Sequence, residues 1–219
     1  MKKVLLITST RAADDIQEVL RIQDTINALR SMRYSVDLLT PRLSNLLDVA
    51  VDLAARVFVM PRIPFCGKVP PRASLRRFAL SALMALRGAV LVACNKYTLL
   101  HGFNDGALIA RSITRLTFSS CPYIAEFHTP FAGASSSDPR VAFARSQERR
   151  AFRKAAAIIL PDAETLERFG SKLSRARVSL IPNARIDFAP DAFDDFTVGD
   201  FNAAIAHVYE YVLRSQSKD

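Results

Sequence analysis

The stretch RVSLIPNARIDFAPDAF (residues 177–193) raises the question of how this chain is organised. Its first five residues, RVSLI, predict a short buried strand, and the rest predicts a linker into a second domain. Beyond it, however, lies one amphipathic helical pattern over residues 200–215, with apolar residues on a single stripe. We therefore expect this last helix to dock on the part of the chain that precedes the linker.

Strand and helix patterns alternate through the upstream sequence. The helical patterns cover residues 14–30, 75–86, 105–116, 139–156 and 163–169. The strand patterns cover residues 2–9, 34–39, 55–61, 88–94, 122–127, 156–160 and 177–181. This alternation predicts an α/β fold: a single Rossmann-like, doubly wound parallel sheet with helices on both faces and the C-terminal helix docked back on it.

Composition narrows the class of protein. The chain has 219 residues, 50% of them hydrophobic, and a formal net charge of +9. The positive net charge indicates contact with polyanions or reflects an Arg-rich genome. Because the Arg residues occur along the whole chain, both interpretations stay open. Arg87 and Gly88 divide the most apolar stretch, residues 78–94, into a helix and a strand that are each too short to span a bilayer. MKKVLLITST contains no export signal, so we expect a cytoplasmic protein. Cys94 and Cys121 lie in apolar surroundings, and we expect both to be small core residues.

Several chemistries lack their sequence patterns. The first strand is followed by STRAADD and not by Gly-x-Gly-x-x-Gly, which argues against an NAD or FAD site. We find no P-loop and no nucleophile elbow, and the three His residues are scattered, so we predict no metal and no bound cofactor. Aromatic residues do not interleave with the basic runs, so we predict no nucleic-acid partner.

Ligands of open α/β sheets bind at the carboxyl ends of the strands, and two loops are candidates on that basis. Thr10 and Arg11 follow the first strand and could contact a phosphate, the alternative being an ordinary polar loop. Asn95, Tyr97 and His101 follow the expected strand 88–94 and could bind substrate, the alternative being turn chemistry.

Two further candidates carry titratable side chains. Glu126 and His128 alternate near the end of strand 122–127, so both can project to one face, where a His can donate a hydrogen bond or carry a proton. A structural His is the alternative. Glu148 falls on the apolar stripe of helix 139–156, where a carboxylate needs hydrogen bonds. We favour a structural hydrogen bond for Glu148 over a ligand contact.

The order of three motifs resembles the N-terminal half of GT-B glycosyltransferases of the family-4 type. The motifs are PYIAEFH (122–128), Glu148 before AAIILPD (156–162), and IPNARID (181–187). The resemblance covers roughly residues 1–188. It implies that this half binds the acceptor, that a nucleotide sugar is the donor, and that His128 contacts the donor sugar. It also places the loop after the first strand beside the donor diphosphate, and Asn183 in the linker motif as a minor or structural residue.

The chain departs from the family pattern. STRAAD replaces the usual Gly-Gly, Ala184 replaces the linker Gly, and no donor domain is encoded between the linker and the last helix. The resemblance thus implies a glycosyltransferase N-terminal-like domain over residues 1–188. Residues 189–199 then form a linker where the donor domain would be inserted, and residues 200–219 form a final helix of the same domain.

Two hypotheses for function remain. The chain is the acceptor-binding half of a sugar transferase that needs a separate donor-binding partner, or it is a non-catalytic, degenerate domain that binds or dimerises through its cleft face. The basic helix 76–87 would suit a lipid-phosphate acceptor at the inner membrane face, the alternative being an ordinary core helix.

Overall fold

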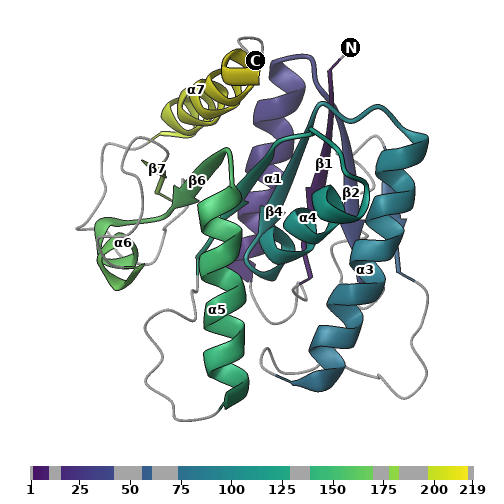
Figure 1. Ribbon diagram of the computed structural model, residues 1–219. Helices are drawn as coiled ribbons and strands as arrows, with labels where there is room; N and C mark the ends of the chain where they lie inside the picture. The colour runs from purple at the N-terminus through teal and green to yellow at the C-terminus, as the bar shows by residue number, and fades with distance from the viewer. Residues whose placement is uncertain are drawn as a thin grey trace.

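Seven parallel strands form one sheet in the order β3-β2-β1-β4-β5-β6-β7 (Figure 1). The computed structural model describes residues 2–9, 16–41, 56–60, 74–128, 139–169, 178–182 and 197–216. The strands are β1 (Lys3–Ile7), β2 (Ser35–Thr40), β3 (Arg56–Val59), β4 (Leu99–Phe103), β5 (Tyr123–Glu126), β6 (Ala157–Leu160) and β7 (Val178–Leu180). Strand order reverses between β1 and β4, which is where ligands bind in doubly wound sheets.

Helices cover both faces of this sheet. They are α1 (Ile16–Ser31), α3 (Leu75–Cys94), α4 (Asp105–Leu116), α5 (Pro139–Lys154), α6 (Ala163–Phe169) and α7 (Val198–Gln216). Val4 and Leu6 of β1 face a core shared with α1 and α7, whereas Leu5 and Ile7 face a core shared with α3, α4 and α5. Because successive strand residues point to opposite faces, one short apolar strand supplies both cores. The predicted Rossmann-like fold is confirmed.

The C-terminal helix packs on α1, beside the sheet, as the sequence predicted (Figure 1). Phe201, Ile205 and Val212 lie fully buried on its inner stripe. Its first turn is closed by reciprocal hydrogen bonds: the Thr197 amide donates to the Asp200 carboxylate over 2.9 Å, and the Asp200 amide donates to the Thr197 hydroxyl over 3.2 Å. This arrangement is a capping box, so Thr197 is the N-cap and Asp200 lies three residues inside the helix.

The predicted strand over residues 88–94 is wrong, because α3 runs without a break from Leu75 to Cys94. At position 88, α3 packs so closely on α4 that a Cβ would overlap the Ile113 side chain. This close approach explains why a glycine lies inside the helix. Ser74 caps this helix, since its hydroxyl accepts from the Arg77 amide over 3.2 Å. Cys94 ends α3 exposed and not in the core, contrary to the prediction.

The continuity of α3 also changes the interpretation of its hydropathy. Within the part of the chain that the structure describes, α3 is the one helix whose length and composition would suffice to cross a membrane, with a mean hydropathy of 1.6. The expectation that Arg87 and Gly88 split this stretch is therefore wrong. About a third of its most apolar part is buried inside the protein, and the remainder is partly or fully exposed.

Candidate functional site

Three neighbouring strands, β1, β4 and β5, bring polar side chains together at the carboxyl edge of the sheet. Thr8 and Ser9 follow β1, Asn104 follows β4, and His128 stands two residues beyond β5. Because the strands are parallel neighbours, these residues meet although they lie far apart in sequence. This edge is the candidate site.

Asn104 organises the centre of this edge. Its amide nitrogen donates to Glu18 Oε2 over 2.7 Å, and its amide oxygen accepts from the backbone N–H of His128 over 2.9 Å. The hydroxyl of Thr8 donates to the other Glu18 oxygen over 2.5 Å. Asn104 has φ 48° and ψ −118°, a rarely populated conformation for a residue with a side chain. Strained residues of this kind gather at ligand-binding sites, where neighbouring contacts hold them.

Glycine makes the turn after β4 possible. A Cβ at Gly106 would overlap the carbonyl oxygen of Ile7 at the end of β1. A Cβ at Gly102 would likewise overlap the backbone of Gly106 and Ala107. The first turn of α4 can therefore lie directly against β1, and this close approach carries Asn104 and Asp105 to the sheet edge.

A buried ionic network lies beneath His128. Glu126 Oε1 is 2.5 Å from Arg21 Nε and 3.1 Å from His128 Nε2, and Oε2 is 2.9 Å from His101 Nε2. The other nitrogen of His101 lies 2.7 Å from the Tyr209 hydroxyl of α7. Burial would raise the pKa of Glu126, but Arg21 and hydrogen bonds from His101 and His128 hold it well below its usual range. Glu126 is therefore a carboxylate, and it orients the imidazole of His128.

A second ion pair lies at the entry to α4. Arg77 of α3 is 2.8 Å from the Asp105 carboxylate and donates to the Ser9 hydroxyl over 2.9 Å. Both charged side chains are almost fully buried. This pair links α3 and α4 to the end of β1.

The structure unites some of the predicted site residues and separates others. Glu126 and His128 lie together, as their spacing predicted. His101 lies inside β4, fully buried beneath the edge, and does not emerge at it. Glu148 is buried on α5, which agrees with its place on the apolar stripe. Thr10, Arg11 and Asn183 lie outside the described residues.

Asn95 and Tyr97 lie at the opposite edge of the sheet from the one that the sequence predicted. Both precede β4, because the strand is residues 99–103, so they lie at the amino edge. The Tyr97 hydroxyl donates to Asp37 over 2.6 Å, and the Asn95 side chain accepts from Lys3 over 3.3 Å. These contacts brace the starts of β1, β2 and β4, opposite to the candidate site.

Sequence reasoning missed four residues of the edge and its support: Glu18, Arg21, Arg77 and Asn104. Glu18 and Arg21 looked like ordinary polar residues of a helix, and Arg77 like one of many Arg residues. Asn104 had a usable signal, since GFNDG predicts a tight strand-to-helix turn with glycine on both sides. Within the described residues, no cluster of three His, Cys, Asp or Glu side chains is placed to hold a metal ion.

Solved structures similar to this chain include two enzymes whose names mention UDP or a UDP-sugar. UDP-GlcNAc 2-epimerase from Methanocaldococcus jannaschii has a TM-score of 0.54 at 11% identity, over 95% of this chain and 49% of its own. HepE from Anabaena, solved in complex with UDP and glucose, has a TM-score of 0.56 at 13% identity, over 84% of this chain and 45% of its own. The chain therefore spans about half the length of these proteins. At such identity the similarity concerns the fold alone.

A sucrose-phosphate synthase chain from Thermosynechococcus elongatus is similar in another way. That chain holds residues 27–220 and 406–426 of the synthase; it has a TM-score of 0.56 at 14% identity, and the match covers 95% of this chain and 97% of that one. No curated protein sequence matches. The model of the glycosyl transferase 4-like domain matches residues 19–184, which is most of the chain. The chain therefore belongs to the glycosyl transferase 4-like domain family.

Proposed function

We propose that this glycosyltransferase-like protein is the acceptor-binding half of a sugar transferase whose nucleotide-sugar site is supplied by a separate donor-binding molecule. The observation that carries the proposal is the environment of His128 at the carboxyl edge. Its Nε2 lies 3.1 Å from the Glu126 carboxylate, and its Nδ1 is buried with no hydrogen-bond partner among the described residues, so a ligand must enter the edge to reach it. In the neutral ring with its proton on Nε2, Nδ1 is an acceptor for a sugar hydroxyl.

The surrounding residues support a carbohydrate ligand. Asn104, itself held by Glu18, fixes the backbone of His128 through its amide, so the imidazole is oriented both from its backbone and from its ring. Sugar sites use such fixed donors and acceptors because each unmatched hydroxyl costs binding energy. In the proposed reaction the acceptor hydroxyl attacks the anomeric carbon, the nucleoside diphosphate leaves with the bonding electrons, and the hydroxyl proton passes to the departing phosphate. His128 contacts the sugar, and Glu126 positions His128.

The proposed need for a second molecule rests on domain organisation. β7 ends at Leu180 and α7 begins at Val198, an interval too short for a donor domain. The sucrose-phosphate synthase chain, which holds residues 27–220 and 406–426 of that enzyme, matches this chain over nearly its whole length, so a first domain together with a last helix is enough to form this fold. We therefore place the donor site on another molecule that faces the carboxyl edge.

The test measures thermal stability of the purified chain with UDP-GlcNAc, UDP-glucose, UDP and a panel of acceptor sugars. A ligand at about a hundred times its dissociation constant adds about 2.7 kcal/mol of stability. We expect no shift with the nucleotides and a shift with an acceptor sugar. That shift should persist in His128→Ala and in the matched control His207→Ala, which alters an exposed histidine of α7, because His128 is assigned to the donor sugar. Sugar transfer in the presence of a donor-binding partner should be lost in His128→Ala only.

Two outcomes would contradict the proposal. A shift with a nucleotide sugar would mean that the chain holds a donor site by itself, and transfer without a partner would replace the half-enzyme. No shift with any sugar or nucleotide would favour the non-catalytic domain that binds or dimerises through the same edge.

A further inference from the structure

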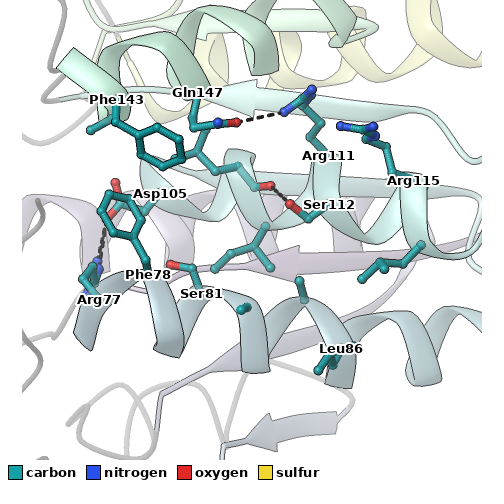
Figure 2. A pocket seen from close by; sticks show the side chains of 16 residues that line it. Arg77, Phe78, Ser81, Leu86, Asp105, Arg111, Ser112, Arg115, Phe143 and Gln147 are labelled. Carbon is teal, nitrogen blue, oxygen red and sulfur yellow. Dashed lines mark hydrogen bonds and ion pairs between the residues drawn. The ribbon is translucent and has the colours of Figure 1, made fainter. Parts of the chain in front are cut away.

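A groove of about 720 Å³ lies between α3, α4 and α5, in the helix layer of the sheet face opposite to α1 and α7. Figure 2 shows Phe78 and Phe143 at one end of it and Arg111 and Arg115 at the other. The two Phe rings meet edge to face, with centroids 5.3 Å apart, and join α3 to α5. The volume is that of a typical small-molecule pocket.

The two ends of the groove differ in charge. At the Phe end, Arg77 is neutralised by Asp105 at 2.8 Å. At the other end, Arg111 donates to the neutral side chain of Gln147 over 3.4 Å, and its Nε is buried with no hydrogen-bond partner among the described residues. Neither Arg111 nor Arg115 forms an ion pair within the described part of the chain. This end of the groove therefore carries positive charge that no described carboxylate offsets.

Other cations add to this charge. Burial lowers the pKa of the Arg111 guanidinium, Tyr123 raises it, and the neighbouring Arg115 and Arg150 lower it again. Cations that lower one another's pKa are stabilised when an anion enters between them. Arg111, Arg115 and Lys154 also line a polar hollow that continues from the groove toward the amino edge of the sheet.

The whole layer is basic. Helices α3, α4 and α5 contain eleven Arg or Lys residues and two acidic residues. Their net charge of +9 equals the formal net charge of the entire chain. Helices α1 and α7 contain three Arg and four acids. One side of the sheet therefore presents nearly all of the surplus charge, which would orient the molecule toward an anionic surface. Two copies of this layer would repel each other.

Large apolar side chains lie exposed beside the basic end. Leu86 and Val90 of α3 are 55% and 62% exposed, and Leu116 at the end of α4 is 49% exposed. Phe118, in the following turn, is 94% exposed and has φ 49°, a left-handed conformation that places a Phe in solvent at a cost in strain. The turn carrying Phe118 and the outer face of α3 border one shallow hollow.

We infer that this face, defined by Leu86, Val90, Leu116 and Phe118 with Arg111 and Arg115, docks on a bilayer of anionic phospholipid. The apolar side chains enter the acyl region, and the two Arg side chains bind headgroup phosphate at the mouth of the groove. Helix α3 remains packed on α4 at Gly88, and Leu91 is buried in the same core, so the helix lies along the membrane and does not cross it. This inference stands on the helix layer and is independent of the sugar-binding proposal.

The test is co-sedimentation of the full chain with vesicles of phosphatidylcholine, alone or mixed with phosphatidylglycerol. We expect binding to the mixed vesicles only, weakened when salt rises from about 0.1 M to about 1 M. Each Arg near the surface contributes about fivefold in affinity, so Arg111→Gln with Arg115→Gln should lose about 25-fold. Lys2→Gln with Arg33→Gln removes the same charge outside the three helices and should lose far less.

Phe118→Asn tests the apolar part without endangering the fold, because Asn accepts a left-handed conformation better than Phe. We expect it to weaken vesicle binding while the chain melts no earlier than the wild type. No binding to anionic vesicles would overturn the inference, and so would equal losses in the two double variants. Binding to duplex DNA that matches vesicle binding and ignores Phe118→Asn would assign the layer to nucleic acid. Self-association lost in Phe118→Asn, without vesicle binding, would assign it to a second copy.

Discussion

The guanidinium of Arg21 lies 2.5 Å from the carboxylate of Glu126, and neither side chain is more than 1% exposed. Arg21 also donates to the carbonyl of Pro182 over 2.8 Å and lies 4.3 Å from the centre of the Phe201 ring. One ion pair thus connects α1, β5, the residues after β7 and the C-terminal helix. It fixes the docking of α7 and the position of the carboxylate that orients His128.

Removing either partner of this pair should destabilise the protein strongly. Arg21→Met or Glu126→Gln leaves the other charge buried without its counter-ion, which costs about 3–5 kcal/mol. The double variant should lose much less than the sum, since no unpaired charge remains. Chemical unfolding of the four proteins measures this coupling. Additive losses would contradict a direct interaction between the two side chains.

Stability should fall in acid because of Glu126. Its pKa is depressed in the folded protein, so its stabilising contribution is complete above the unfolded pKa of about 4.3 and is lost as pH falls through the folded value. The free energy of unfolding should therefore decrease below about pH 5 in the wild type and vary less in Glu126→Gln. Glu210→Gln, at an exposed site on α7, is the control and should keep the wild-type pH profile.

Gly106 should tolerate no side chain. In Gly106→Ala the added methyl would overlap the backbone carbonyl of Ile7, so α4 must move away from β1. We expect a loss of several kcal/mol, of the size seen for overpacked cores. Gly199→Ala is the matched control, because a Cβ there meets only the Thr197 hydroxyl at 3.4 Å and alanine favours the helix. Similar melting temperatures for the two variants would refute the close approach.

The hydroxyl of Tyr209 should stabilise the fold through His101. Tyr209→Phe leaves His101 Nδ1 buried without its partner at 2.7 Å, which costs about 1–3 kcal/mol. Tyr211→Phe changes a partly exposed neighbour on the same helix and should be nearly neutral. Denaturant midpoints of the two variants measure this difference in stability. Equal midpoints would contradict a stabilising contact between Tyr209 and His101.

Cys94 and Cys121 should differ in thiol reactivity. Burial raises the pKa of Cys121 to about 11, whereas Cys94 is exposed at the end of α3. At pH 8 about one Cys121 thiol in a thousand would be ionised, so alkylation should mark Cys94 first. Peptide mapping after brief iodoacetamide treatment measures both sites in the same sample. Equal labelling in the folded chain, as expected after unfolding, would contradict the burial of Cys121.

Much of the fold could be predicted from local pattern. The helices at 105–116 and 163–169 were predicted with their observed bounds, and the docking of the last helix followed from its apolar stripe. The one large error concerned residues 88–94, because GAVLVAC is apolar on every side and so shows no periodicity that separates strand from helix. That error moved Asn95 and Tyr97 to the wrong edge of the sheet.

The order of strands and helices was determined by the sequence itself, because each element buries a face whose spacing is visible within one or two turns of chain. The candidate site and the basic layer were decided by the tertiary structure. Glu18 meets Asn104 across 86 residues and Arg21 meets Glu126 across 105, and these pairings exist only because β1, β4 and β5 are neighbours. Likewise, the Arg residues of three helices that are separate in sequence form one charged side only because α3, α4 and α5 share a face of the sheet.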